Sequence, residues 1–188
     1  MQKIYITPDQ LRLDSYKLGA KVVNDGFQPD FMVALWRGGA PIGCYIHELL
    51  KWKGYDTDHV AIRTSKYTGI GEVGNKVSIH NLGYFLSTLK PDSKVLIVDD
   101  VWDSGHTIDV LLETITSRYQ LPSDKLDIRV ATVYYKPTKN KSSKQPNYFI
   151  HESTEWLVFP HELEDMSIDE VGFAMGSDIK DVLVSTLK

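Results

Sequence analysis

The chain has 188 residues, of which 42% are hydrophobic, and this composition suits one soluble domain with a sizeable core. Its 21 basic and 25 acidic residues give a net charge of −4, which argues against a nucleic-acid partner because such partners usually need a basic face. Cys44 is the only cysteine, so no disulfide can form within the chain, and its apolar surroundings predict a buried side chain.

The amino terminus, MQKIYITPDQ, has no apolar signal-peptide region. No apolar run in the chain is long enough to cross a membrane. We therefore expect a cytoplasmic protein with no membrane partner.

Helices and strands are expected to alternate along the chain. Residues 7–10 have the spacing of a capping box, which predicts a helix from Pro8 to about Asn24 that Gly26 ends. The further predictions, in chain order, are a strand at 31–36, a helix at about 40–52, a strand at 58–63, a strand at 95–98, a helix at about 105–119 and a strand at 127–135. This alternation indicates an α/β fold, with a mainly parallel sheet flanked by helices.

The last part of the chain gives weaker signals. A short polar segment, KPTKNKSSKQP (136–146), leads to the extended-looking NYFIH. The final SDIKDVLVSTL resembles an amphipathic helix, which would pack on the domain or on a second subunit.

Two short patterns match known motifs without the context that these motifs need. Residues 69–74 fit G-x-G-x-x-G, but the residues that follow look extended, whereas a dinucleotide site needs a helix there. We interpret residues 64–75 as a mobile, glycine-rich loop. His161-Glu162 lacks the second histidine of H-E-x-x-H, so no zinc site is expected.

An unbroken apolar strand, Val95 to Val98, runs directly into Asp99 and Asp100. Because neighbouring strand residues point to opposite faces, a continuing strand would bury at least one carboxylate at a high cost. We therefore expect the strand to end here, with both carboxylates in a cleft at its carboxyl end. Ligands of open α/β sheets bind at such clefts.

The turn from Asp103 to Thr107 lies between this strand and the next predicted helix. Backbone N–H groups and the helix dipole favour a phosphate at such a position, and Ser104 and Thr107 add hydroxyl donors. The alternative is an ordinary helix cap with nothing bound. The two upstream aspartates favour the phosphate site, because they add acids that can bind hydroxyls or a metal.

The whole stretch VLIVDDVWDSGHT (95–107) resembles the phosphoribosyl pyrophosphate (PRPP) motif of type I phosphoribosyltransferases. Ser104 stands where threonine is commoner, and it keeps the hydroxyl. The resemblance extends over roughly residues 30–162 and is closest to the purine enzymes of the hypoxanthine or xanthine-guanine type. It implies one phosphoribosyltransferase domain over residues 1–188, with a core at about 20–140 and a small hood from about 1–10 and 145–188.

The resemblance also implies a set of site residues. For PRPP these are Asp99, Asp100, Asp103, Ser104, Gly105, His106, Thr107, Arg37 and Gly38. For the purine they are Lys136, Trp156, Leu157 and Glu162. Mg²⁺ would be held by Asp99, Asp100 and Glu162, and Asp103 would be the catalytic base. The Trp36–Arg37 peptide bond is a candidate for a cis bond, because pyrophosphate loops of this family often contain one, although the sequence itself does not show it.

The reaction implied is a Mg²⁺-dependent transfer of phosphoribose from PRPP to a purine base, giving a nucleoside monophosphate and pyrophosphate. We expect a homo-oligomer, most simply a dimer. Three alternatives remain open: a regulator of the same fold that binds PRPP or nucleotides without catalysis, an adenine-preferring transferase, and a receiver-like domain whose acids bind Mg²⁺ for phosphorylation. The receiver-like domain leaves both the 103–107 turn and Arg37-Gly38-Gly39 unexplained.

Overall fold

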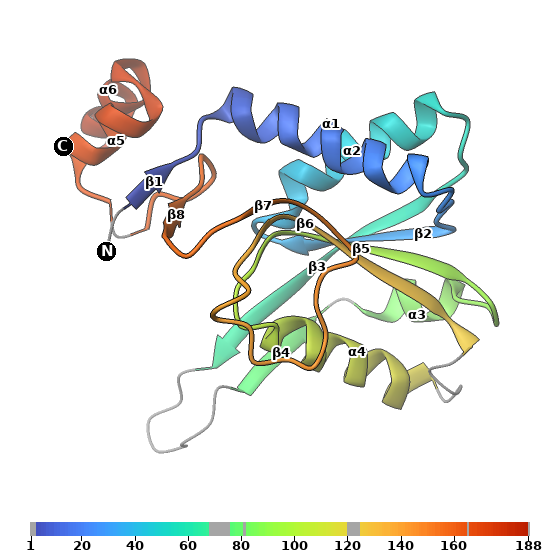
Figure 1. Ribbon diagram of the computed structural model, residues 1–188. Coiled ribbons are helices and arrows are strands. Elements are labelled where there is room, and N and C mark those ends of the chain that lie inside the picture. Colours follow the sequence, from blue (N-terminus) through green and yellow to red (C-terminus); the bar gives the residue numbers. More distant parts are fainter. Residues whose placement is uncertain (1–2, 68–75, 81, 120–124, 165, 188) are drawn as a thin grey trace. The chain divides into compact units, whose positions relative to one another are not determined.

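A six-stranded sheet organises most of the computed structural model, which describes residues 3–67, 76–80, 82–119, 125–164 and 166–187 (Figure 1). Its spatial order is β4-β3-β2-β5-β6-β7, and only the β3–β4 pair is antiparallel. The strands are β2 (Phe31–Trp36), β3 (Asp58–Tyr67), β4 (Lys76–His80), β5 (Lys94–Trp102), β6 (Asp127–Tyr135) and β7 (Tyr148–Glu152). The predicted α/β fold with a mainly parallel sheet is therefore confirmed.

Helices cover both faces of this sheet (Figure 1). They are α1 (Pro8–Asn24), α2 (Gly39–Trp52), α3 (Leu82–Thr88) and α4 (His106–Tyr119). On one face, α3 and α4 bury a core against the central strands that includes Phe85, Leu111 and Ile97. On the other face, α2 lies so close to β2 that a Cβ on Gly43 would be 3.0 Å from Ala34 Cβ.

The start of α1 confirms the predicted cap. The Thr7 hydroxyl accepts a hydrogen bond from the Gln10 N–H at 3.1 Å, which satisfies one amide of the first turn. Gly26, two residues beyond the helix, has a φ of 70°. A positive φ costs glycine little, so the chain can turn sharply there towards β2.

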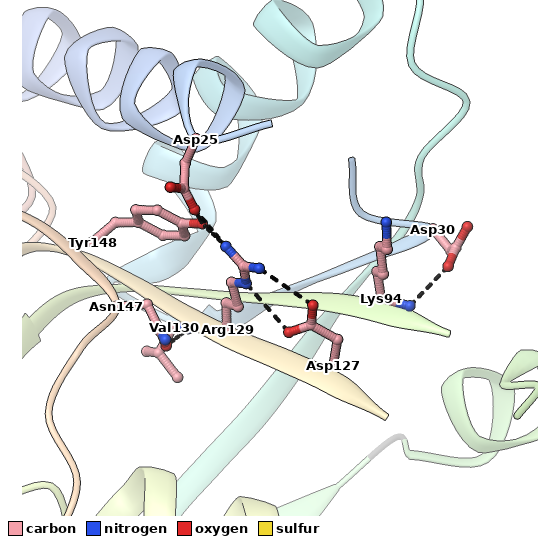
Figure 2. Close-up of polar contacts among 8 residues, drawn as sticks. All are labelled: Asp25, Asp30, Lys94, Asp127, Arg129, Val130, Asn147 and Tyr148. Atoms are coloured by element: carbon pink, nitrogen blue, oxygen red, sulfur yellow. Dashed lines mark hydrogen bonds and ion pairs between the residues drawn. The ribbon is translucent and has the colours of Figure 1, made fainter. Parts of the chain in front are cut away.

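Polar side chains fix the amino-terminal ends of the central strands (Figure 2). The Arg129 guanidinium donates to Asp25 at 2.5 Å, to the Tyr148 hydroxyl at 2.6 Å and to Asp127 at 3.2 Å. Asp25 directly follows α1, Tyr148 lies in β7 and Asp127 lies in β6, so one side chain joins three segments of the chain. The opposite, carboxyl-terminal ends of the strands hold the residues that the sequence singles out.

Cys44 corrects one prediction, because this cysteine is exposed rather than buried. The buried positions of α2 include Ile42, Gly43, Ile46 and His47. Their spacing of three and four residues leaves position 44 on the outer side of the helix. The apolar composition around Cys44 therefore reflects the neighbouring face and not the cysteine's own position.

The chain forms two compact units, one of residues Asp14–Thr154 and one of Met1–Leu13 with Glu155–Lys188. The second unit contains the parallel strands β1 (Lys3–Tyr5) and β8 (Trp156–Val158) and the helices α5 (Ile168–Met175) and α6 (Ser177–Ser185). A capping box of Ser167 and Glu170 starts α5, and Glu170 also pairs with Lys3 of β1. Among the described helices of both units, none is long and apolar enough to cross a membrane.

Candidate active site

The two adjacent aspartates lie within β5 rather than beyond its end. The prediction that the strand stops at Asp99 is wrong, because β6 continues beside it and pairs Asp99 with Thr132 and Trp102 with Tyr135. Asp100 is only 9% exposed, and Asp99 is half-buried. Both carboxylates still lie near the carboxyl end of the strand, which is where ligands of open α/β sheets bind.

The burial of these acids has an electrostatic cost. Burial, and then the neighbouring Asp100 carboxylate, raise the pKa of Asp99 well above its ordinary value. A hydrogen bond from the Asp100 N–H to Asp99 Oδ1, at 3.1 Å, acts in the opposite direction. The pair therefore concentrates negative charge in a partly dry place, and a cation or the hydroxyls of a ligand would relieve this repulsion.

Residues 37–39 form the turn from β2 to α2, next to β5 in the sheet. A Cβ on Gly38 would lie 1.9 Å from Asp100 Oδ2, and a Cβ on Gly39 would lie 2.2 Å from the Val98 carbonyl oxygen. Real Cβ atoms do not approach so closely, so a side chain at position 38 would displace the Asp100 carboxylate, and one at position 39 would displace backbone. The backbone at Gly38 and Gly39 thus lies directly against Val98 and Asp100 of β5.

The peptide bond between Trp36 and Arg37 is cis, which confirms the prediction. The Trp36 side chain is 55% exposed, and Arg37 is also exposed. The guanidinium of Arg37 is therefore accessible to a negatively charged ligand at this edge of the sheet.

The 103–107 turn joins β5 to the amino terminus of α4, which begins at His106. Gly105 has a φ of 79°, a conformation that glycine adopts readily, and its carbonyl accepts from the Asp109 N–H at 3.0 Å. The Ser104 hydroxyl lies 3.4 Å from the His106 N–H, so a capping contact is present. The first turn of α4, with Thr107, directs its N–H groups to the strand ends and favours an anion.

Lys136 follows β6 directly and is only 4% exposed. Its ammonium lies 3.4 Å from Asp103 Oδ2, and its backbone N–H donates to the Trp102 carbonyl at 2.9 Å. A buried ammonium is costly unless it is paired, so the half-exposed Asp103 supplies its counter-charge. The structure thus brings together two residues that the sequence places far apart.

The segment after Lys136 is a structured part of this site, which the sequence analysis missed. Asn140 accepts from the Trp102 indole N–H at 3.0 Å, and the Lys141 N–H donates to the Ser104 carbonyl at 3.0 Å. A lysine-rich polar segment has the composition of an ordinary surface loop, and no periodicity marks its contacts. Only the fold shows that it lies on the 103–107 turn.

The other predicted purine residues belong to the second unit. Trp156 is 54% exposed and lies in β8, beside Lys3 of β1. Leu157 is buried, and the half-buried Glu162 lies beside Phe159, whose N–H is 3.5 Å from Glu162 Oε2. Their part in binding a purine or a metal stays a prediction. The predicted loop at 64–75 begins too early, because residues 64–67 continue β3 and pair with β4. Residues 68–75 lie outside the described part of the chain.

Comparisons with known proteins agree on one family. The model of the phosphoribosyl transferase domain matches residues 10–167. A purine phosphoribosyltransferase from Pyrococcus horikoshii Ot3 is 25% identical with a TM-score of 0.66, over 89% of this chain and 99% of that chain. No curated protein matches the chain.

Two more distant structures share the fold. A protein from Neisseria gonorrhoeae with bound ppGpp has a TM-score of 0.69 at 23% identity, over 94% of this chain and 97% of that chain. The xanthine-guanine-hypoxanthine phosphoribosyltransferase of Helicobacter pylori has a TM-score of 0.68 at 17% identity, over 97% and 99%. The match of a family model over most of the chain carries more weight than either likeness.

Proposed function

Because the chain belongs to the phosphoribosyl transferase domain family, we propose that it transfers the 5-phosphoribosyl group of PRPP to a 6-oxopurine. The products are a nucleoside monophosphate and pyrophosphate, so the enzyme would serve purine salvage. The observation that carries this proposal is the Lys136–Asp103 pair, which sets a buried donor 3.4 Å from a carboxylate acceptor.

This pair matches one edge of a 6-oxopurine. O6 and N7 are neighbours on that edge, and O6 accepts a hydrogen bond, whereas adenine presents a donor amino group in its place. An ammonium can only donate, so Lys136 suits O6 and would oppose the amino group of adenine. Asp103 can accept the hydrogen of a protonated N7. Hypoxanthine, guanine and xanthine therefore fit better than adenine.

The remaining residues of the first unit suit PRPP. The 103–107 turn would bind the 5′-phosphate through backbone N–H groups and the hydroxyls of Ser104 and Thr107. Asp99 and Asp100 would accept hydrogen bonds from the ribose hydroxyls. Arg37 and the backbone at Gly38 would bind the pyrophosphate, whose negative charge grows as it leaves.

Carboxylates, phosphate oxygens and water are the ligands that Mg²⁺ prefers, so the closely spaced Asp99 and Asp100 suit this ion, directly or through water. Glu162 would be a further ligand of this ion. When bound, Mg²⁺ would neutralise charge on the pyrophosphate.

In the reaction, the bond from ribose C1 to the pyrophosphate oxygen breaks while a bond from C1 to a purine nitrogen forms. The sugar passes through a transition state like an oxocarbenium ion, as in other glycosyl transfers. Asp103 accepts the proton that the purine loses at N7, and the Lys136 ammonium stabilises negative charge on O6. Trp156 would stack on the base, and Leu157 would line its pocket.

Pyrophosphate release from PRPP and Mg²⁺, with and without hypoxanthine, tests this function. A transferase releases pyrophosphate only when the purine is present, and in equal amount to the nucleotide formed. A non-catalytic protein of the same fold would bind PRPP in equilibrium dialysis and release none. That result would replace the transferase with a PRPP-binding regulator.

A further inference from the structure

Asn140 is the centre of a hydrogen-bond network at the 103–107 turn. Its Oδ1 accepts from the Trp102 indole N–H at 3.0 Å and from the Ser142 N–H at 3.1 Å. Its Nδ2 donates to the Lys144 carbonyl at 2.8 Å. One amide side chain therefore holds the 139–144 segment in a fixed curve and ties it to the last residue of β5.

The same segment contacts both sides of the turn. The Lys141 N–H donates to the Ser104 carbonyl at 3.0 Å, inside the turn itself. The Ser142 hydroxyl donates to Asp109 Oδ1 at 2.8 Å, in the first turn of α4. These bonds join the segment to the residues before and after Gly105.

Gly105 shows how closely side chains of the 139–144 segment lie against the turn. A Cβ at this position would lie 2.7 Å from Ser142 Cβ and 3.0 Å from Asn140 Oδ1. The segment therefore lies directly on the turn, with no space for even one methyl group between them. If the segment moved away, the turn would lose these contacts and the hydrogen bonds that hold it on that side.

Charge gives the contact with Asp109 a further effect. A carboxylate in the first turn of α4 repels a phosphate bound at the same helix end. The Lys144 ammonium lies 3.4 Å from Asp109 Oδ1, and the Ser142 hydroxyl donates to the same oxygen. Both contacts reduce the charge that Asp109 presents to the helix terminus.

We propose that Asn140 and Ser142 are positioning residues, which hold the 103–107 turn in the geometry that binds the 5′-phosphate. Lys136 lies three residues before the 139–144 segment, and its carbonyl accepts from the N–H groups of Lys139 and Asn140, both at 3.1 Å. The segment therefore also sets the spacing between the phosphate turn and the purine-side lysine. This inference rests on the proposed function for the identity of the phosphate.

Two probes separate this role from general stability. Ribose 5-phosphate carries only the 5′-phosphate and so probes the 103–107 turn. Pyrophosphate probes the turn at residues 37–39, to which we assign the leaving group. Calorimetric titration of the full-length protein should show ribose 5-phosphate binding about tenfold weaker in Asn140→Ala and about threefold weaker in Ser142→Ala, from the loss of four side-chain hydrogen bonds and of two. Pyrophosphate affinity should stay at the wild-type value in both variants.

Ser143→Ala is the matched control, since Ser143 is the exposed neighbour of Ser142. It should bind both probes like the wild type. If Asn140→Ala fails to fold, Ser142→Ala still decides, because it removes a single hydroxyl. Equal weakening of both probes, or ribose 5-phosphate binding as tight as in Ser143→Ala, would overturn the positioning role.

Failure of the proposed function gives a different result. A wild type that binds ribose 5-phosphate but releases no pyrophosphate with any purine is not a transferase, and the variants still test the positioning role. A wild type that does not bind ribose 5-phosphate overturns the positioning role directly.

Discussion

At the residue scale, the central feature of this protein is a group of ionisable side chains that are buried or half-buried, although burial disfavours their charged forms. Asp99 and Asp100 lie inside a strand whose other described residues are mainly apolar, and burial raises the pKa of Asp99. Lys136 is buried with Asp103 as its counter-charge. A carboxyl such as that of Asp99, whose pKa is raised by burial and by a nearby charge, is typical of a functional site. The site therefore costs stability in the absence of its ligands.

Asp99→Asn should stabilise the ligand-free protein at neutral pH and abolish its activity. A carboxyl whose pKa is higher in the folded state than in the unfolded state binds its proton more tightly when folded. Its ionisation therefore destabilises the fold as the pH rises from the unfolded pKa through the folded one, and the penalty is complete above both. Urea unfolding between acidic and mildly alkaline pH should show that Asp99→Asn raises the free energy of unfolding, and that this gain grows with pH.

Asp56→Asn is the control for this experiment, since Asp56 is an exposed aspartate in the same unit. Its effect should be small throughout the pH range. A stability difference between Asp99→Asn and the wild type that is constant with pH would contradict the account of Asp99.

Asp103→Asn should slow turnover while PRPP still binds. The amide keeps the shape of the carboxylate but accepts no proton from the purine, and such acid–base assistance is typically worth about 10²–10⁴-fold in rate. The change also removes the counter-charge of Lys136, so the KM for the purine should rise. Steady-state kinetics at saturating PRPP measure both quantities. An unchanged kcat would exclude Asp103 as the base.

At the element scale, glycine backbones bring the site together. Gly39 starts α2, and a Cβ there would lie 2.2 Å from the Val98 carbonyl oxygen of β5. A Cβ on Gly105 would lie 2.7 Å from Ser142 Cβ in the 139–144 segment. Turns that follow three strands, β2, β5 and β6, thereby meet at one edge of the sheet. Gly39 lies close to backbone, and Gly105 lies close to side chains, so both kinds of close contact set the geometry here.

Gly39→Ala should therefore destabilise the protein, by about 1–3 kcal/mol as for other overpacked sites. Its Cβ would lie 2.2 Å from a backbone oxygen, so a strand or a helix must move. Gly83→Ala is the matched control, because a Cβ there in α3 meets no atom within 4 Å and alanine favours helices. Urea unfolding of both variants compares them. Equal stability of the two would show that α2 and β5 separate easily.

The sequence predicts most of the elements of the first unit. Apolar runs and caps place α1, β2 and β6 at or near their observed bounds. The predicted end of β5 at Asp99 is wrong. The cost of burying Asp99 favours an earlier end, but pairing with the neighbouring β6 extends the strand to Trp102. Local patterning does not contain the partner strand, so this error comes from tertiary structure.

The site was predictable in its motif but not in its supports. Asp99, Asp100 and the 103–107 turn are contiguous, so the sequence shows them together. The contact of Lys136 with Asp103 spans 33 residues, and that of Asn140 with Trp102 spans 38. Contacts at such separations depend on the sheet order, which no local pattern specifies.

At the scale of the whole molecule, the phosphoribosyl transferase fold brings the carboxyl ends of the parallel strands together, and there lie the residues of the first unit to which we assign the chemistry. The first unit supplies the residues that we assign to PRPP and the Lys136–Asp103 pair. The second unit supplies Trp156, Leu157 and Glu162, which we assign to the base and the metal. We assign the choice of the 6-oxo group to Lys136.

The most direct test of this account is nucleotide formation from PRPP and Mg²⁺ with adenine, hypoxanthine, guanine or xanthine, measured for the wild type and Lys136→Met. The wild type should show a kcat/KM about ten- to hundredfold higher for a 6-oxopurine than for adenine, because an ammonium facing an amino group leaves buried donors unpaired. Lys136→Met should lose most of the 6-oxopurine activity while its PRPP affinity stays nearly intact. A higher kcat/KM for adenine in the wild type would contradict the assignment of Lys136, and no nucleotide with any of these purines would contradict the transferase itself.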